Sequence, residues 1–226
     1  MPKHTLTGLM ALIKEVLPQE PGPSLLSFLD KLRGLGDAPA SGALRYHHAY
    51  PGGLVDHIID TYQIANDLSA TQTVGSPVPR PTAIDLLLVA VLHDIHKVQD
   101  AIGTSYYQPN ILKSGKRSEA EPFEHNSNYL KSACVSDTAE PTWKEVMFLH
   151  REGVDKMPGG VKSLALISAL APDLYAHLGE EVLYAIRYHD GAYGHNKYEL
   201  AGKETPLMIL FHAADMLSSR LNRIAK

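Results

Sequence analysis

The chain has 226 residues, of which 44% are hydrophobic and 20% are charged, and its formal net charge is −4. This length and apolar content suit one compact domain with a real core, and the acidic balance argues against a general nucleic-acid binder, which usually carries a basic excess. The single cysteine, Cys134, excludes an internal disulfide. The apolar run Leu86–Leu92 is far shorter than the ~20 residues that span a bilayer. We therefore expect a soluble cytoplasmic protein with no membrane partner.

Apolar residues recur along the chain at helical spacing, and no stretch alternates as a half-buried strand would. Pro18 ends the first expected helix, Thr82 with Asp85 begins a helix that runs through Val98, and Pro206 takes the first position of the last helix. The expected helices cover 6–16, 24–33, 53–68, 83–98, 123–132, 142–150, 161–170, 180–189 and 206–224, and a long polar loop covers 99–122. The pattern indicates one all-α domain of roughly nine helices over residues 1–226.

The apolar run that ends at Leu92 is followed directly by His93 and Asp94. A buried imidazole and carboxylate cost free energy unless they are satisfied, and together they suit divalent Mn, Fe, Co, Ni or Zn. One histidine on an apolar face is more often a hydrogen-bonded core residue than a ligand. Here further histidines and an aspartate share such positions on other helices, namely His57, His125, His189 and Asp215. This combination predicts a metal site.

The order of His57, the doublet His93–Asp94 in "LHDIHK", and Asp215 resembles the H…HD…D pattern of the HD superfamily of metal-dependent phosphohydrolases. The flanking stretches "YHHAYPGGLVDH" and "FHAADMLSSRLN" are similar to the 3′-to-5′ exoribonuclease branch of that superfamily. The resemblance covers about 45–223, with a helical insertion over 134–180, and leaves 1–44 as an N-terminal helical extension. It implies an HD-domain helical bundle in which the four residues bind one metal ion.

Some branches of the superfamily bind a second ion with additional histidines. His125 and His189 fall where these ligands would lie, and His150 is a weaker candidate. Asp94 would then bridge the two ions. The alternative is a one-metal site in which the three histidines contact the substrate or support the ligands. The expected cofactor is one or two ions of Mn, Co, Ni, Zn or Fe, with Mg as a further candidate.

A divalent ion lowers the pKa of bound water, which suits phosphoester hydrolysis. The resemblance gives Asp94 the task of orienting or deprotonating the water. Lys97 would hold a substrate phosphate, although a solvated lysine that complements a helix dipole is an equal alternative. His48 would protonate the leaving group, and His47 would contact the substrate beside it.

The polar loop carries further candidates for substrate binding. Lys113, Lys116 and Arg117 would clamp phosphates, and Tyr107, with Tyr106, would stack on a base. An ordinary solvated loop is the alternative for each of these residues taken singly.

Two departures from the exoribonuclease branch bear on the substrate. His96 stands where that branch usually has glycine, and only the extension 1–44 stands where it tends to carry a nucleic-acid-binding barrel. With the acidic net charge, these departures favour a nucleotide, a (d)NTP or (d)NMP, over an oligonucleotide.

The expected protein is a metal-dependent phosphohydrolase in which activated water attacks phosphorus. A 3′-to-5′ exonuclease acting on single-stranded RNA or DNA ends is the first alternative. From other classes, the alternatives are a di-iron oxygenase on the same scaffold and a non-catalytic nucleotide-binding module. The sequence leaves the oligomeric state open, although the helices over 142–189 could serve an interface in a homo-oligomer.

Overall fold

The computed structural model describes residues 2–42, 46–71, 79–109, 148–150, 157–191 and 197–224. These ranges are predominantly helical, as expected for the all-α class, and include one two-stranded antiparallel sheet. No helix within them has the length and apolar character needed to cross a membrane. The identity of the bundle as an HD domain stays a prediction.

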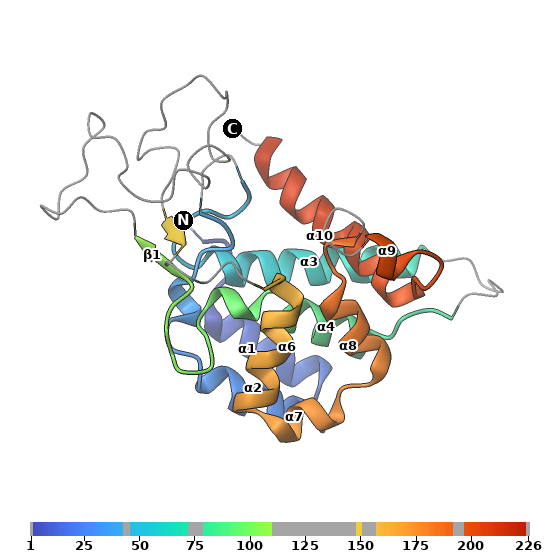
Figure 1. Ribbon diagram of the computed structural model, residues 1–226, viewed down its shortest axis with the longest axis horizontal. Coiled ribbons are helices and arrows are strands. Elements are labelled where there is room, and N and C mark those ends of the chain that lie inside the picture. The colour runs from blue at the N-terminus through green and yellow to red at the C-terminus, as the bar shows by residue number, and fades with distance from the viewer. Residues whose placement is uncertain are drawn as a thin grey trace, which may run out of the picture.

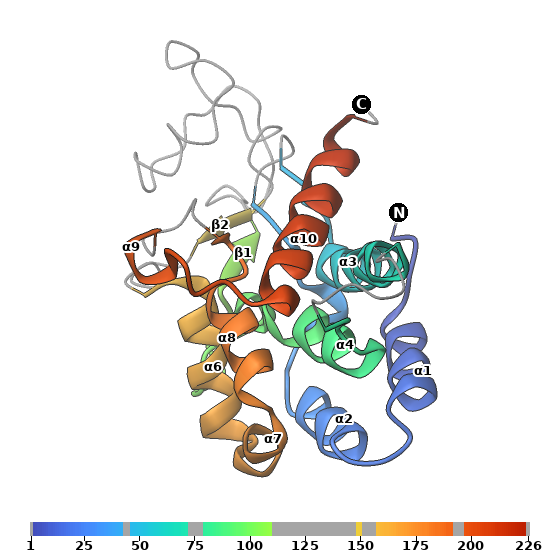
Figure 2. The same cartoon turned by 90° about the vertical axis from the view of Figure 1, so that its right-hand side faces the viewer.

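Two N-terminal helices, α1 (Leu6–Val16) and α2 (Gly22–Asp30), lie side by side at one end of the bundle (Figure 2). Helix α1 has the predicted bounds, and the Thr5 side chain caps its N-terminus. Helix α2 ends earlier than predicted, because Lys31 and Leu32 donate to carbonyls only three residues back, which tightens the last turn. The fully buried residues of this pair include Leu9, Ile13, Leu25 and Phe28.

Three helices form the centre of the molecule: α3 (Gly53–Ala70), α4 (Ala83–Leu92) and α10 (Pro206–Ile224). Helix α10 packs along α3, and α4 lies beneath both (Figures 1 and 2). All residues from Leu86 to Leu92 are buried, as a helix that is apolar all round requires. Helices α3 and α10 begin at the predicted residues, Gly53 and Pro206.

The predicted end of α4 at Val98 is wrong, because the α-helix stops at Leu92 and a short 3₁₀ turn, η2 (Ile95–Lys97), follows. The cause is a tertiary hydrogen bond: the Ser163 hydroxyl donates to the His93 carbonyl at 2.7 Å. That carbonyl would otherwise accept from Lys97, whose N–H bonds to the Asp94 carbonyl instead. The early stop places the polar residues after Leu92 in a tight corner rather than along a helix.

The predicted helix over 142–150 is wrong in its last three residues, which form strand β2 (Phe148–His150). This strand pairs with β1 (Tyr107–Pro109) in antiparallel register, with Tyr107 opposite His150. The Phe148 N–H also donates to the Gly42 carbonyl at 3.0 Å. These non-local hydrogen bonds outweigh the local helical preference. The rest of that predicted helix, and the one over 123–132, lie outside the described residues.

The C-terminal half adds α6 (Gly159–Leu170), α7 (Pro172–His177), α8 (Glu180–Arg187) and the short α9 (Lys197–Leu200). Helices α6 and α8 correspond to the predictions over 161–170 and 180–189, whereas α7 and α9 were not predicted. Their buried apolar residues join the N-terminal helices in one continuous hydrophobic cluster. Helix α7 contacts α2, so this half closes against the first two helices. The domain bounds inferred from the sequence stay predictions.

Candidate metal centre

The four predicted ligands come together where α3, α4 and α10 meet. His57 lies on α3, Asp215 lies on α10, and His93 and Asp94 directly follow α4. The Nε2 of His57 is 3.2 Å from the Nε2 of His93, 3.1 Å from Asp215 Oδ1 and 3.7 Å from Asp94 Oδ2. Both histidines are fully buried. Side chains distant in the sequence therefore converge on one small volume.

Hydrogen bonds at the far ring nitrogens orient the histidines. The Nδ1 atoms of His93 and His189 lie 2.9 and 2.8 Å from carbonyl oxygens of their own preceding turns. A carbonyl only accepts, so each Nδ1 carries a proton, and Nε2 is the ring nitrogen that can bind a metal ion. The Nδ1 of His57 lies 3.1 Å from the Ser218 hydroxyl of α10. Metal-binding histidines are held in this way, with Nε2 directed at the ion.

Two carboxylates, the buried Asp94 and the partly buried Asp215, stay ionised in this cluster. Burial alone would raise the pKa of Asp94, but the charges of Lys97 and His93 hold that pKa well below its usual range. Burial likewise opposes ionisation of Asp215, and the hydrogen bond with His57 keeps its pKa below the usual value. Lys97 Nζ contacts Asp94 Oδ2 at 2.5 Å. One lysine thus faces two carboxylates, a balance that a further cation improves.

The environment of His93 shows how a cation would be bound. Burial lowers the pKa of this histidine, but the adjacent Asp94 carboxylate more than offsets that effect and raises it. Asp94 Oδ2 lies 3.4 Å from His93 Nε2. A proton and a metal ion compete for the same Nε2, so metal binding at this site releases protons and weakens at lower pH.

His189, at the end of α8, extends the cluster beyond the four ligands. Its Nε2 lies 3.7 Å from Asp94 Oδ1, so Asp94 turns one oxygen to His57 and His93 and the other to His189. His189, Asp190 and Asp215 also form a group whose ligand atoms lie within 4.8 Å of one another. Asp190 was not anticipated, although the second His–Asp doublet in the sequence was a signal for it.

Other candidate ligands and substrate contacts are less fully placed. His150 lies in β2, where its backbone pairs with Tyr107. The remaining candidates, His125, Lys113, Lys116 and Arg117, lie outside the described residues. Whether one or two ions bind stays a prediction.

The two adjacent histidines before α3 point in different directions. His47 lines the cavity beside the metal cluster, its ring centre is 4.6 Å from that of His57, and both of its nitrogens are buried without a hydrogen-bond partner among the described residues. His48 does not line this cavity, and its Nε2 instead lies 3.2 Å from Asp60 Oδ2. The placement therefore favours His47, the predicted substrate contact, and gives no support to His48, the predicted acid for the leaving group, because His48 faces Asp60 instead.

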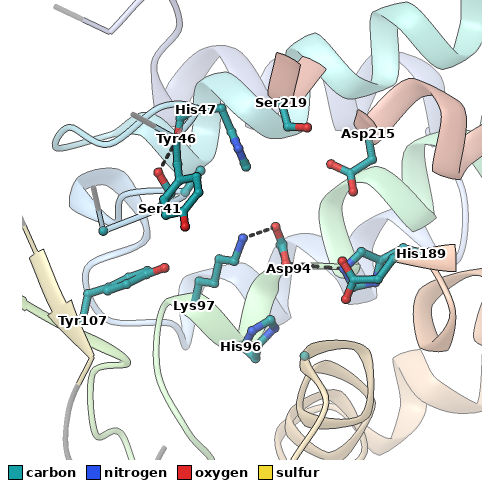
Figure 3. A pocket seen from close by; sticks show the side chains of 14 residues that line it. Ser41, Tyr46, His47, Asp94, His96, Lys97, Tyr107, His189, Asp215 and Ser219 are labelled. Carbon is teal, nitrogen blue, oxygen red and sulfur yellow. Dashed lines mark hydrogen bonds and ion pairs between the residues drawn. The ribbon is translucent and has the colours of Figure 1, made fainter. Parts of the chain in front are cut away.

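A cavity of about 340 Å³ opens over the candidate metal ligands (Figure 3). Asp94, His189 and Asp215 lie at one side of it, and Tyr107 lies at the other with Lys97 between them. The Lys97 side chain is only 16% exposed, which contradicts its alternative interpretation as a solvated lysine at a helix end. Tyr46 also lines this cavity and was not predicted, whereas Tyr106 lines a neighbouring one.

The residues fit a divalent transition metal. Bonds from Zn²⁺ to imidazole nitrogen or carboxylate oxygen are about 2.0–2.2 Å long, so two ligands of one tetrahedral or octahedral ion lie about 3.0–3.5 Å apart. Two of the separations from His57 Nε2, 3.1 Å to Asp215 and 3.2 Å to His93, fall in this range, and the third, 3.7 Å to Asp94, is slightly longer. The mixture of imidazole and carboxylate suits Mn, Fe, Co, Ni or Zn better than Mg, which prefers oxygen ligands.

Comparisons with known proteins add no relative: no family model, curated protein or solved structure matches this chain.

Proposed function

We propose that the protein is a metal-dependent phosphohydrolase that acts on a nucleotide. The observation that carries this proposal is the cluster of His57, His93, Asp94 and Asp215, which brings imidazole Nε2 atoms and ionised carboxylates to metal-ligand spacing. It lies at the base of a cavity that also holds an amine and an imidazole, from Lys97 and His47. The resemblance of the sequence to the HD superfamily supports the same activity.

The residues of this cavity would divide the work of hydrolysis. His57, His93, Asp94 and Asp215 would hold the ion, which supplies Lewis acidity and lowers the pKa of water. Asp94 would accept a hydrogen bond from the attacking water and orient it. The Lys97 ammonium, fixed beside Asp94, would offset charge on the phosphoryl oxygens. His47 would donate a hydrogen bond to the substrate from a ring that has no hydrogen-bond partner within the described part of the chain.

A nucleotide fits the described cavity better than a polynucleotide. Of the described residues that line it, Lys97 is the one cation, and its charge is already shared with Asp94. A nucleic-acid track would need several cations along the path of the backbone. The aromatic rings of Tyr46 and Tyr107 offer surfaces for one base. The 3′-to-5′ exonuclease is retained as an outcome of the test.

The test is release of phosphate or pyrophosphate from a panel of nucleotides and one short single-stranded oligonucleotide. Each reaction is run with Mn²⁺, Co²⁺, Ni²⁺, Zn²⁺ or Mg²⁺. We expect metal-dependent release that His93→Ala and Asp94→Ala reduce by at least ~100-fold. The matched control is His177→Ala, because this exposed histidine lies on α7 and, among the described residues, hydrogen-bonds to the Asp173 carbonyl of its own helix.

The best substrate separates nucleotidase from exonuclease. No release with any ion, from protein shown by elemental analysis to contain metal, would overturn the proposal. In that case a mixed-valent iron signal would indicate the oxygenase, and nucleotide binding without turnover would indicate a binding module.

A further inference from the structure

A second cavity of about 330 Å³ lies next to the cavity over the candidate metal ligands, which we call the metal cavity. The proposed reaction does not use this second cavity. Three segments of the chain each place one residue in the metal cavity and a nearby residue in the second cavity, so the two cavities lie on opposite sides of one wall. In the metal cavity these residues are Lys97, Tyr107 and Gly159, and in the second cavity they are Gln99, Tyr106 and Met157. The His96 side chain, which lines both cavities, therefore stands in the wall itself.

The His96 ring is held firmly in that position. Its Nδ1 lies 3.0 Å from the Ser163 hydroxyl, and the Tyr106 ring meets it edge-on with centres 5.2 Å apart. Gly159 closes against its third side: a Cβ at this position would lie 2.8 Å from His96 Cε1, so only glycine leaves room for the ring. Figure 3 shows His96 between Lys97 and α6. The His96 ring is therefore packed against Ser163, Tyr106 and Gly159.

We propose that His96 is a partition that limits the length of the substrate in the metal cavity. This inference rests on the proposed function, because it concerns the substrate of the same site. At about 340 Å³ the metal cavity is near the small end of ligand sites, which span ~300–1,000 Å³. Removing the imidazole would join it to the second cavity and roughly double the space. With His96 in place, a substrate cannot extend toward α6.

The chemistry of the second cavity identifies what would enter once the partition is removed. The Lys162 ammonium lies 4.9 Å from the centre of the Tyr106 ring, and Met157, Ala165 and Leu166 add apolar surface. A cation beside an aromatic face suits a second nucleotide unit, with its phosphate near Lys162 and its base against Tyr106. The protein without His96 would therefore accept a dinucleotide.

The test compares kcat/KM for a nucleoside monophosphate and for a 5′-phosphorylated dinucleotide of the same base. Wild-type protein should prefer the monophosphate, and His96→Gly should shift the ratio toward the dinucleotide by at least ~10-fold. Adding Lys162→Met to His96→Gly should remove that gain, whereas Lys162→Met alone should leave the wild-type ratio unchanged. An unchanged ratio in a folded His96→Gly protein that still cleaves the monophosphate overturns the partition.

Two further measurements separate this proposal from folding defects and from the proposed function. If His96→Gly does not fold, His96→Asn takes its place, because the smaller amide can keep the hydrogen bond to Ser163. If wild-type protein cleaves neither compound, the proposed hydrolysis is judged separately, from the nucleotide panel described above. The partition is then judged from calorimetric Kd values of the same intact compounds. For each metal-loaded protein, the Kd of the dinucleotide is divided by the Kd of the monophosphate. If this ratio is no lower in the variant than in wild type, the partition is overturned.

Discussion

At the scale of single residues, the Asp60 carboxylate of α3 lies close to three basic side chains from the segments that precede this helix. Its carboxylate lies 3.2 Å from Lys3 Nζ, 3.2 Å from His48 Nε2 and 3.6 Å from His4 Nε2. Burial alone would raise the pKa of Asp60, but the hydrogen bonds from His48 and Lys3 hold it well below the usual value. A depressed folded-state pKa adds stability above the unfolded value of about 3.9, and that stability is lost as the pH falls toward the folded pKa.

We therefore expect Asp60→Asn to lower the free energy of unfolding by about 1–2 kcal/mol at pH 7, with a smaller difference from wild type at pH 3. Urea denaturation at the two pH values measures both differences. The control is Asp67→Asn, an exposed position on the same helix, which should show little effect at either pH. An Asp60→Asn deficit that is equally large at pH 3 and pH 7 would contradict the pKa argument.

The sequence could predict a site residue where the spacing of apolar residues along a helix already determines which way its side chain points. His57, His93 and Asp215 follow from apolar helical faces, where neighbours fix the side that each residue occupies. The roles of His47 and His48 could not be separated in this way, because they depend on a backbone detail. His48 has a positive φ of 47°, so two adjacent rings leave the chain toward different sides. No pattern of residue types encodes that turn.

At the scale of elements, helix ends were predictable where a local cap sets them and not where a tertiary bond does. Thr82 caps the start of α4 through its own side chain, as the sequence indicated. The end of α4 depends on Ser163, a residue 70 positions from His93 along the chain. Strand β2 depends on pairing with β1. A prediction made from the residues next to β2 in the sequence does not include β1, so it could not find this pairing.

Ser163 joins α6 to the corner that carries two of the candidate metal ligands, His93 and Asp94. Its hydroxyl donates to the His93 carbonyl and lies 3.3 Å from the His96 N–H and 3.0 Å from His96 Nδ1. Ser163→Ala leaves these buried groups without that partner, so we expect a loss of about 1–3 kcal/mol in the free energy of unfolding. We also expect about 10-fold weaker metal binding, because the ligand corner loses its support.

Chemical denaturation and metal titration measure the two effects of Ser163→Ala. The matched control is Ser168→Ala, an exposed serine on the same helix, which should change neither quantity. Normal metal affinity in a clearly destabilised Ser163→Ala protein would show that the hydroxyl supports the fold without positioning the ligands.

At the scale of the whole molecule, the candidate metal ligands belong to the helices that organise the core. Helix α10 packs along α3, α4 contacts both, and each of the three elements carries or directly precedes a ligand. An ion bound by His57, His93 and Asp215 would therefore link segments that are far apart in the unfolded chain. Because the unfolded chain cannot assemble this set of ligands, metal binding should appear as stability of the entire fold.

For protein stripped with EDTA, we expect an added ion at ~100 times its Kd to contribute about 2.7 kcal/mol and to raise Tm by about 5–10 °C. Differential scanning calorimetry with Zn²⁺ or Mn²⁺ measures the shift. His93→Ala should lose most of it, because one of the buried ligands at the junction of the three helices is gone. His177→Ala, which removes an exposed histidine from α7, should keep it. An equal rise in Tm for His93→Ala would place the ion elsewhere, and no rise in wild-type protein would contradict a metal centre at this junction.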